Sequence, residues 1–148
     1  KMSKLDEAKE EVKRADHLLY VTLKYTRTTD VIKNAIYRLI TAYDYAVIHA
    51  LEVLKKKKKI KLIPLTPVSR AELLMENNKR DINMIDYLNG YFLLRKIHRA
   101  EYTKTEEFRK NVSLTVMHND EVIEINIATL EELYNKTKLF IDYVAEKY

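Results

Sequence analysis

Residues that usually interrupt or cross-link a chain are scarce in this sequence. Its 148 residues include no cysteine, one glycine and two prolines. Without cysteine, the chain can form neither a disulfide framework nor a thiolate metal site. A single glycine also excludes the glycine-rich loops that cradle phosphates. So few helix-breaking residues favour long, uninterrupted helices.

Long apolar runs are missing as well. No stretch approaches the roughly 20 apolar residues of a membrane-spanning helix, and no segment resembles a secretory signal. Together with the absence of cysteine, this predicts a cytoplasmic protein with no membrane span. The lysine-, glutamate- and tyrosine-rich composition is typical of thermophiles, including archaeal ones.

Recognisable catalytic and metal-binding motifs are also missing. None of the four histidines has metal-ligand spacing to another histidine or to a carboxylate cluster, so we expect no metal and no cofactor. No serine lies in a nucleophile motif, and the acidic residues are spread along helix surfaces. The sequence therefore assigns no catalytic residue and favours a binding protein over an enzyme.

The positive charge is concentrated in one segment. The formal net charge of +5 comes from 27 basic and 22 acidic residues, and without one lysine run the chain is close to neutral. This run predicts salt-sensitive, sequence-independent binding to nucleic acid or to an acidic membrane surface. Alternatively, it is a solvated helix C-terminus, where lysines favour the negative end of the helix dipole. The run comprises Lys55, Lys56, Lys57, Lys58, Lys59 and Lys61.

Apolar residues recur every three or four positions in several segments, as in amphipathic helices. Such helices are predicted over residues 3–25 and from about 30 to 54, and the second is apolar on two sides, as in the centre of a bundle. The short link "TRTTD" between them predicts an antiparallel pair. The expected N-caps of the later helices are Thr29 or Asp30, Ser69, Asp81 or Asn83, and Thr129.

The segments "VSLTVM" and "EVIEINI" alternate in polarity on either side of the turn-like "HND". This pattern predicts a β-hairpin with strands at 112–117 and 121–126. The sequence therefore predicts a mainly α fold: an antiparallel bundle of four to five helices with a short β-hairpin at about 112–126 before the last helix. We expect residues 1–148 to form a single domain.

The densest polar cluster lies in "LRKIHRAEYTKTEEFR". If one helix continues through residues 95–109, five polar side chains share one face, since they are spaced by three or four positions. The capping-box pattern "TKTE" at 103–106 leaves open a break near Thr103, which would divide this face. Such a strip could bind phosphate, through forked arginine donors, a histidine that titrates near neutral pH and a tyrosine that stacks. Alternatively, it is a solvated face with internal ion pairs. The strip comprises Arg95, His98, Tyr102, Glu106 and Arg109, with Arg99 beside it.

The helical pattern "NAIYRLITAYDYAVIHALEVL" and the closing segment "LEELYNKTKLFIDYV" resemble the HEPN superfamily, the higher eukaryote and prokaryote nucleotide-binding domains. The resemblance extends from about Leu5 to Tyr143. It implies a helical domain, a homodimer and, in many members, RNA cleavage by an arginine and a histidine separated by four to six residues. Here two residues separate Arg95 from His98, and no other arginine–histidine pair fits. Arg38 and Tyr43 match only a looser form with tyrosine in place of histidine, and Tyr43 lies on the apolar face, so no catalytic residue is carried over.

Three functions remain open from the sequence. The first is a non-catalytic module that binds nucleotide or RNA through the helix face between Arg95 and Arg109, helped by the lysine run. The second is a metal-independent ribonuclease with an altered site. The third is a protein-interaction subunit, with a partner such as the nucleotidyltransferase of related two-gene or toxin–antitoxin systems.

Overall fold

The computed structural model describes residues 2–148, which form five helices and a small antiparallel sheet. The first helix runs from Lys4 to Tyr25 and contains one π-helical turn. The predicted mainly α fold is confirmed. The elements are α1 (Lys4–His17), η1 (Leu18–Thr22), α2 (Leu23–Tyr25), α3 (Thr29–Lys56), α4 (Pro67–Glu76), α5 (Ile82–Arg99), β1 (Tyr102–Thr105), β2 (Ser113–His118), β3 (Glu121–Asn126) and α6 (Ile127–Lys147).

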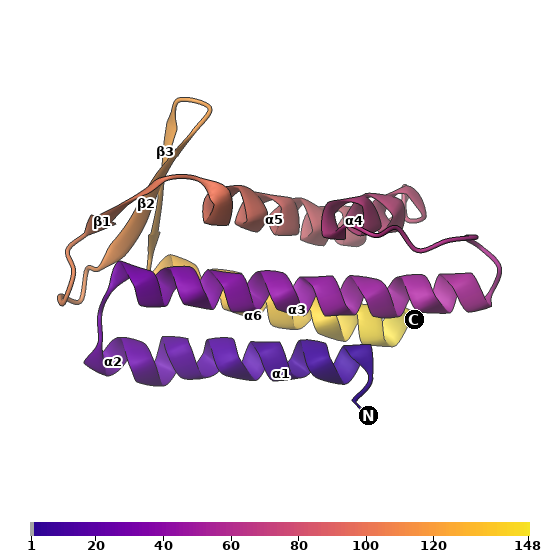
Figure 1. Ribbon diagram of the computed structural model, residues 1–148, viewed down its shortest axis with the longest axis horizontal. Helices are drawn as coiled ribbons and strands as arrows, with labels where there is room; N and C mark the ends of the chain where they lie inside the picture. The colour runs from indigo at the N-terminus through magenta and orange to yellow at the C-terminus, as the bar shows by residue number, and fades with distance from the viewer. Residues whose placement is uncertain (1) are drawn as a thin grey trace.

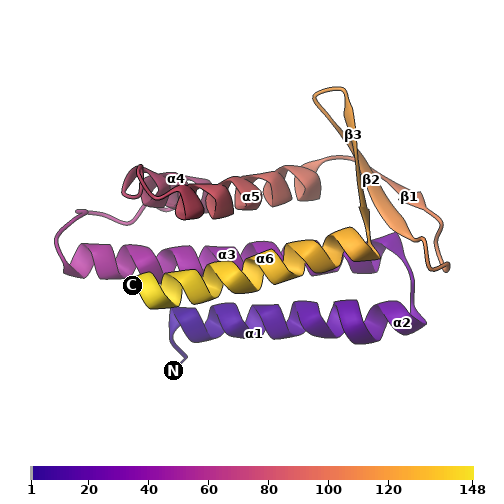
Figure 2. The ribbon, with the colours of Figure 1, turned by 180° about the vertical axis from the view of Figure 1, so that it is seen from behind.

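The helices lie nearly parallel to one long axis, with α3 in the middle (Figure 1). The first helix packs antiparallel to α3, α6 lies alongside both, and α5 with the short α4 covers the remaining side of α3 (Figures 1 and 2). The sheet lies at the end of the bundle where α3 begins. Within residues 2–148, no helix combines the length and the apolar character that crossing a membrane requires.

Helix α3 supplies the centre of the core. Three aromatic side chains join it to α5 and α6: Tyr43, Tyr91 and Phe140 are each at most 1% exposed. The ring centroids of Tyr43 and Phe140 are 4.6 Å apart in a stacked arrangement, and those of Tyr43 and Tyr91 are 5.4 Å apart. Burial of side chains this large contributes about 1.5–3 kcal/mol each, so this cluster holds three helices together.

Three helices, α3, α4 and α6, begin at other N-cap residues than the sequence predicted. Thr28 caps α3 and Thr66 caps α4, while Asn126 caps α6; each accepts a hydrogen bond from the backbone N–H three residues ahead. Thr29, Ser69 and Thr129 therefore lie inside the helices. For α4 the reason is Pro67, whose fixed φ suits the first helical position, so the helix begins before Ser69. The predicted cap at Asp81 is confirmed.

The predicted hairpin is confirmed, with Asn119 and Asp120 at positive φ in a two-residue turn between β2 and β3. A third strand, β1, was not predicted and pairs antiparallel with β2. The sequence left open either one helix over 95–109 or a break near Thr103, and the structure has the break, with the chain leaving the helix at Ala100. The helix ends at Arg99 because Ala100 is already extended, and the sequence "YTKT" favours a strand.

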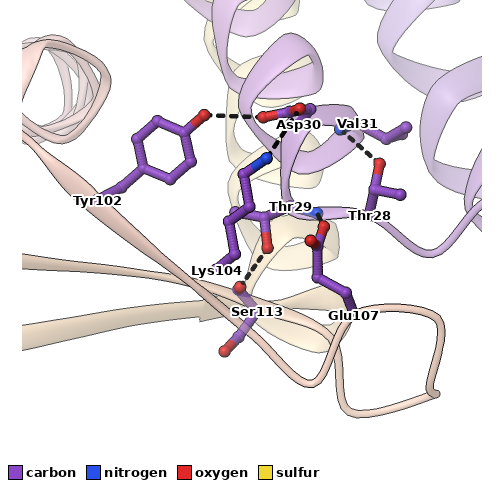
Figure 3. A network of polar contacts seen from close by, with 8 residues as sticks. All are labelled: Thr28, Thr29, Asp30, Val31, Tyr102, Lys104, Glu107 and Ser113. Carbon is purple, nitrogen blue, oxygen red and sulfur yellow. Dashed lines mark hydrogen bonds and ion pairs between the residues drawn. The ribbon is translucent and has the colours of Figure 1, made fainter.

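The sheet is fixed to the first turn of α3 by polar contacts (Figure 3). Thr29, which is fully buried, donates from its hydroxyl to the carbonyl of Ser113 at 2.8 Å. Its backbone N–H donates to the carboxylate of Glu107 at 2.8 Å. Asp30 accepts from the Tyr102 hydroxyl at 2.7 Å and from Lys104 at 3.3 Å. Glu107 therefore satisfies one backbone N–H at the start of α3, and the strand residues hold the side chains of its first turn.

Replacement of Thr29 by Val should test this junction. Thr29→Val keeps the shape but removes the donor to the buried Ser113 carbonyl, so we expect a loss of about 1–3 kcal/mol in the free energy of unfolding. Urea denaturation followed by circular dichroism measures it. Thr103→Val on the exposed face of β1 is the matched control and should change stability by less than about 0.5 kcal/mol. Equal effects of both substitutions would contradict the role of Thr29.

Candidate functional site

A cleft lies between α3 and α5 on the side away from α1. The two helices run antiparallel, so Tyr37 of α3 lies against His98 of α5, and Asp44 lies against Tyr91. The cleft has a volume of about 310 Å³, at the lower end of the range of ligand pockets in proteins. It is lined by Tyr37, Ile40, Thr41 and Asp44 from α3 and by Arg95, His98 and Arg99 from α5.

Asp44 is the one carboxylate that lines this cleft, and it is largely buried. The Tyr91 hydroxyl donates a hydrogen bond to Asp44 Oδ1, and Arg95 Nη1 donates to the Tyr91 hydroxyl oxygen at 3.4 Å. Burial raises the pKa of Asp44, and the Tyr91 hydrogen bond and the Arg95 charge oppose this rise. Burial and the nearby Asp44 charge raise the pKa of Tyr91, so Tyr91 keeps its proton and connects Asp44 to Arg95.

Arg95 is held in place by Tyr91, which lies between it and Asp44, and not by a direct ion pair. Its guanidinium carbon lies 5.8 Å from the centroid of the Tyr91 ring, and its enclosed Nε has no hydrogen-bond partner among residues 2–148. Within this described part of the chain, neither Arg95 nor the neighbouring Lys96 and Arg99 forms an ion pair. These three cations are therefore available to an external anion.

His98 supplies an aromatic ring and a titratable group beside these cations. Its ring centroid lies 5.7 Å from that of Tyr37, which is 47% exposed. Partial burial lowers the pKa of His98, and the charges of Lys33 and Arg95 lower it further. The imidazole is therefore neutral near pH 7, with one nitrogen able to accept a proton or a hydrogen bond.

A second cleft, of about 430 Å³, lies on the opposite flank of α5, where α4 faces it. Val68 and Glu72 of α4 and Phe92 and Leu93 of α5 line this cleft. Arg95 and Arg99 line both clefts. These two arginines therefore form a ridge between two hollows, and below we call them the arginine ridge.

The structure brings together only part of the predicted strip. Arg95, His98 and Arg99 lie at the α3–α5 cleft. Tyr102 lies in β1, where its hydroxyl binds Asp30 and its ring lies 4.4 Å from Lys33 Nζ. Arg109 lies in the loop after β1 and pairs with Glu106 at 3.5 Å. Because the helix ends at Arg99, Tyr102 and Arg109 do not line the cleft, and the expectation of one continuous helix face is wrong.

The lysine run lies at the other end of α3. Helix α3 ends at Lys56, and Lys57 and the positive-φ Lys58 begin the loop that follows. At about 1.5 Å per residue, Lys56 lies roughly 28 Å from Tyr37 along the helix. The run is solvent-exposed and occupies a helix C-terminus, as one interpretation of the sequence expected. A ligand the size of one nucleotide at the cleft cannot reach it.

Sequence patterns missed half of the cleft. Tyr37, Asp44 and Tyr91 lie in segments that the apolar periodicity assigns to the core, and their partners come from another helix. The sequence offered one indication of Asp44, because an acidic residue stands out inside the apolar stretch "ITAYDYAVIHAL". Such a carboxylate needs a polar partner, which the sequence alone does not identify. No group of three histidine or acidic side chains within residues 2–148 is arranged to hold a metal ion.

Comparisons with family models, with curated proteins and with solved structures find no match to this chain. The class of protein therefore follows from the fold and the cleft. It is a helical bundle with basic, aromatic-lined clefts on both flanks of one helix.

Replacement of Lys33 by Gln tests the electrostatics of the cleft. Because the Lys33 charge helps to lower the pKa of His98, the pKa of His98 should rise in Lys33→Gln, as measured by NMR titration of the imidazole resonances. Lys79→Gln at the opposite end of α5 is the control, and it removes the same charge from an exposed lysine. A rise of equal size in the control would mean that overall charge, not Lys33, sets this pKa.

Proposed function

We propose that the cleft between α3 and α5 binds the phosphate of a nucleotide or of RNA, and that the chain is a non-catalytic, HEPN-like binding module. The observation that carries this proposal is the arginine ridge: two arginines that form no ion pair within residues 2–148, beside the half-exposed ring of Tyr37. Guanidinium groups bind phosphate oxygens through two parallel hydrogen bonds, and a tyrosine ring stacks on any base.

The remaining groups of the cleft fit a nucleoside. The Asp44 carboxylate can accept a hydrogen bond from a ribose hydroxyl or a base N–H. The Thr41 hydroxyl, which donates to the Tyr37 carbonyl at 3.0 Å, can accept one. Tyr91 and Arg95 fix the position of Asp44, so little ordering is needed when a ligand binds. The cleft therefore offers the recognition groups for phosphate, sugar and base within one small volume.

A second candidate, RNA cleavage without a metal, is favoured by one observation. His98 is neutral near pH 7 and lies on the same cleft as Arg95 and Arg99. A neutral imidazole can take the proton of a 2′-hydroxyl, and the arginines can stabilise the charge that develops on the phosphate. This candidate predicts RNA cleavage in the presence of a chelator, lost in His98→Ala. Binding without cleavage supports the non-catalytic module.

The homodimer and the protein partner that the sequence suggested remain predictions. Tyr20, Val21 and Tyr25 are exposed at the end of the first helix, which supports a contact with another chain. Sedimentation at several protein concentrations tests self-association.

Replacement of Arg99 by Gln tests the binding proposal. Arg99 is exposed and Arg99→Gln should leave the fold intact, but it removes charge-assisted hydrogen bonds to phosphate. We expect at least a roughly tenfold loss of affinity for a labelled single-stranded RNA of about ten nucleotides, measured by fluorescence anisotropy. Arg95→Gln should act in the same direction.

The matched control for this measurement is Arg109→Gln. Arg109 carries the same charge but lies in the loop after β1 and pairs with Glu106. If Arg109→Gln weakens binding as much as Arg99→Gln does, overall charge rather than the cleft governs the affinity, and the proposal is wrong.

The lysine run should contribute only to long ligands. Joint replacement of Lys57, Lys58 and Lys59 by Gln should weaken binding of the same RNA. It should also reduce, by up to about 2, the steepness of the plot of the logarithm of the binding constant against the logarithm of the salt concentration. It should leave the affinity for AMP unchanged, because the run lies roughly 28 Å from Tyr37. The control is the joint replacement of Lys9, Lys13 and Lys24, which are exposed on the first helix. An equal loss in both triple variants would show that the run has no special role.

A further inference from the structure

We infer that the two clefts beside α5 hold two successive nucleosides of single-stranded RNA, with the phosphodiester that joins them on the arginine ridge. This inference deepens the proposed function and rests on it. A site of this kind would bind a dinucleotide more tightly than a mononucleotide.

The arginine ridge is placed to hold a phosphate that joins two groups. Arg95 and Arg99 are four residues apart, so they lie about one turn apart on the same face of α5. Both line the α3–α5 cleft and both line the α4–α5 cleft. A phosphate bound to them therefore has a hollow on each side.

The two clefts offer similar recognition groups, although they are built from different helices. Each has one carboxylate, Asp44 in the first and Glu72 in the second. Each also has an apolar or aromatic wall: the Tyr37 ring, 47% exposed, in the first, and Leu93, 40% exposed, beside Phe92 in the second. With volumes of about 310 and 430 Å³, both fall in the usual range for small-ligand pockets.

The arrangement favours single strands. A base that enters either cleft must turn its face to a side chain and its edge to a carboxylate, which requires it to be unpaired and unstacked. Duplex RNA would present only its phosphates to the arginine ridge. The structure thus points to unpaired RNA as the ligand class.

A comparison of AMP with the dinucleoside monophosphate ApA tests the inference. AMP carries a phosphate with about −1.5 to −2 charges and ApA only one negative charge, so a simple phosphate site would bind AMP more tightly. Two occupied clefts would reverse this order. By isothermal titration with the wild-type protein, we expect ApA to bind at least about tenfold more tightly than AMP, since stacking of a second base adds affinity.

Two variants separate the clefts. Tyr37→Ala and Leu93→Ala each change a side chain that is well exposed, so both proteins should fold. Each should lower the affinity for ApA to about that for AMP. Because AMP can occupy the unchanged cleft, its affinity should fall by no more than about twofold in either variant.

Each contrary outcome is distinguishable. If AMP binds and ApA binds no more tightly, the two-cleft inference is overturned while the proposed function stands. If ApA binds more tightly but Tyr37→Ala or Leu93→Ala leaves its affinity unchanged, the cleft at that residue holds no nucleoside, and the inference is also overturned. If neither compound binds, both the inference and the proposed function fall.

Discussion

The burial of α3 is the constraint on which the rest of the structure depends. This helix is apolar on more than one side, and its buried residues extend from Thr29 to Leu54. Exposing that surface to water would cost far more than the net stability of a small domain, so the first helix, α5 and α6 must cover it. The bundle and its antiparallel order follow from this requirement, whereas polar contacts with the first turn of α3 fix the sheet at the end of the bundle.

Covering α3 also creates the site. Polar groups on a buried helix need partners, and two are supplied by distant parts of the chain: Tyr91 for Asp44, and Ser113 for Thr29. The Asp44–Tyr91–Arg95 chain ends in a guanidinium that has no acidic partner in the described residues. The same packing that satisfies a buried carboxylate thus orients a cation at the cleft, where we propose that a phosphate binds.

Structure that depends on neighbouring residues was predictable from the sequence, whereas contacts between distant segments were not. Apolar spacing predicted the helices and polarity alternation predicted the hairpin, since both depend on neighbouring residues. The strand β1 was missed because it is stabilised by pairing with β2, across the loop that joins the two strands. For the same reason Arg95, His98 and Arg99 were found as neighbours on one helix, whereas Tyr37 and Asp44 meet them only after α3 and α5 pack together.

The central claim is that the cleft between α3 and α5 binds a phosphate-bearing ligand. The most direct measurement is an NMR titration of the ¹⁵N-labelled wild-type protein with AMP, which maps the backbone amides whose resonances shift. The account predicts the largest shifts on both sides of the arginine ridge, at Tyr37, Thr41, His98 and Arg99 and also at Leu93, with little change in the lysine run. Shifts confined to the lysine run or to the sheet, with α3 and α5 unaffected, would contradict it.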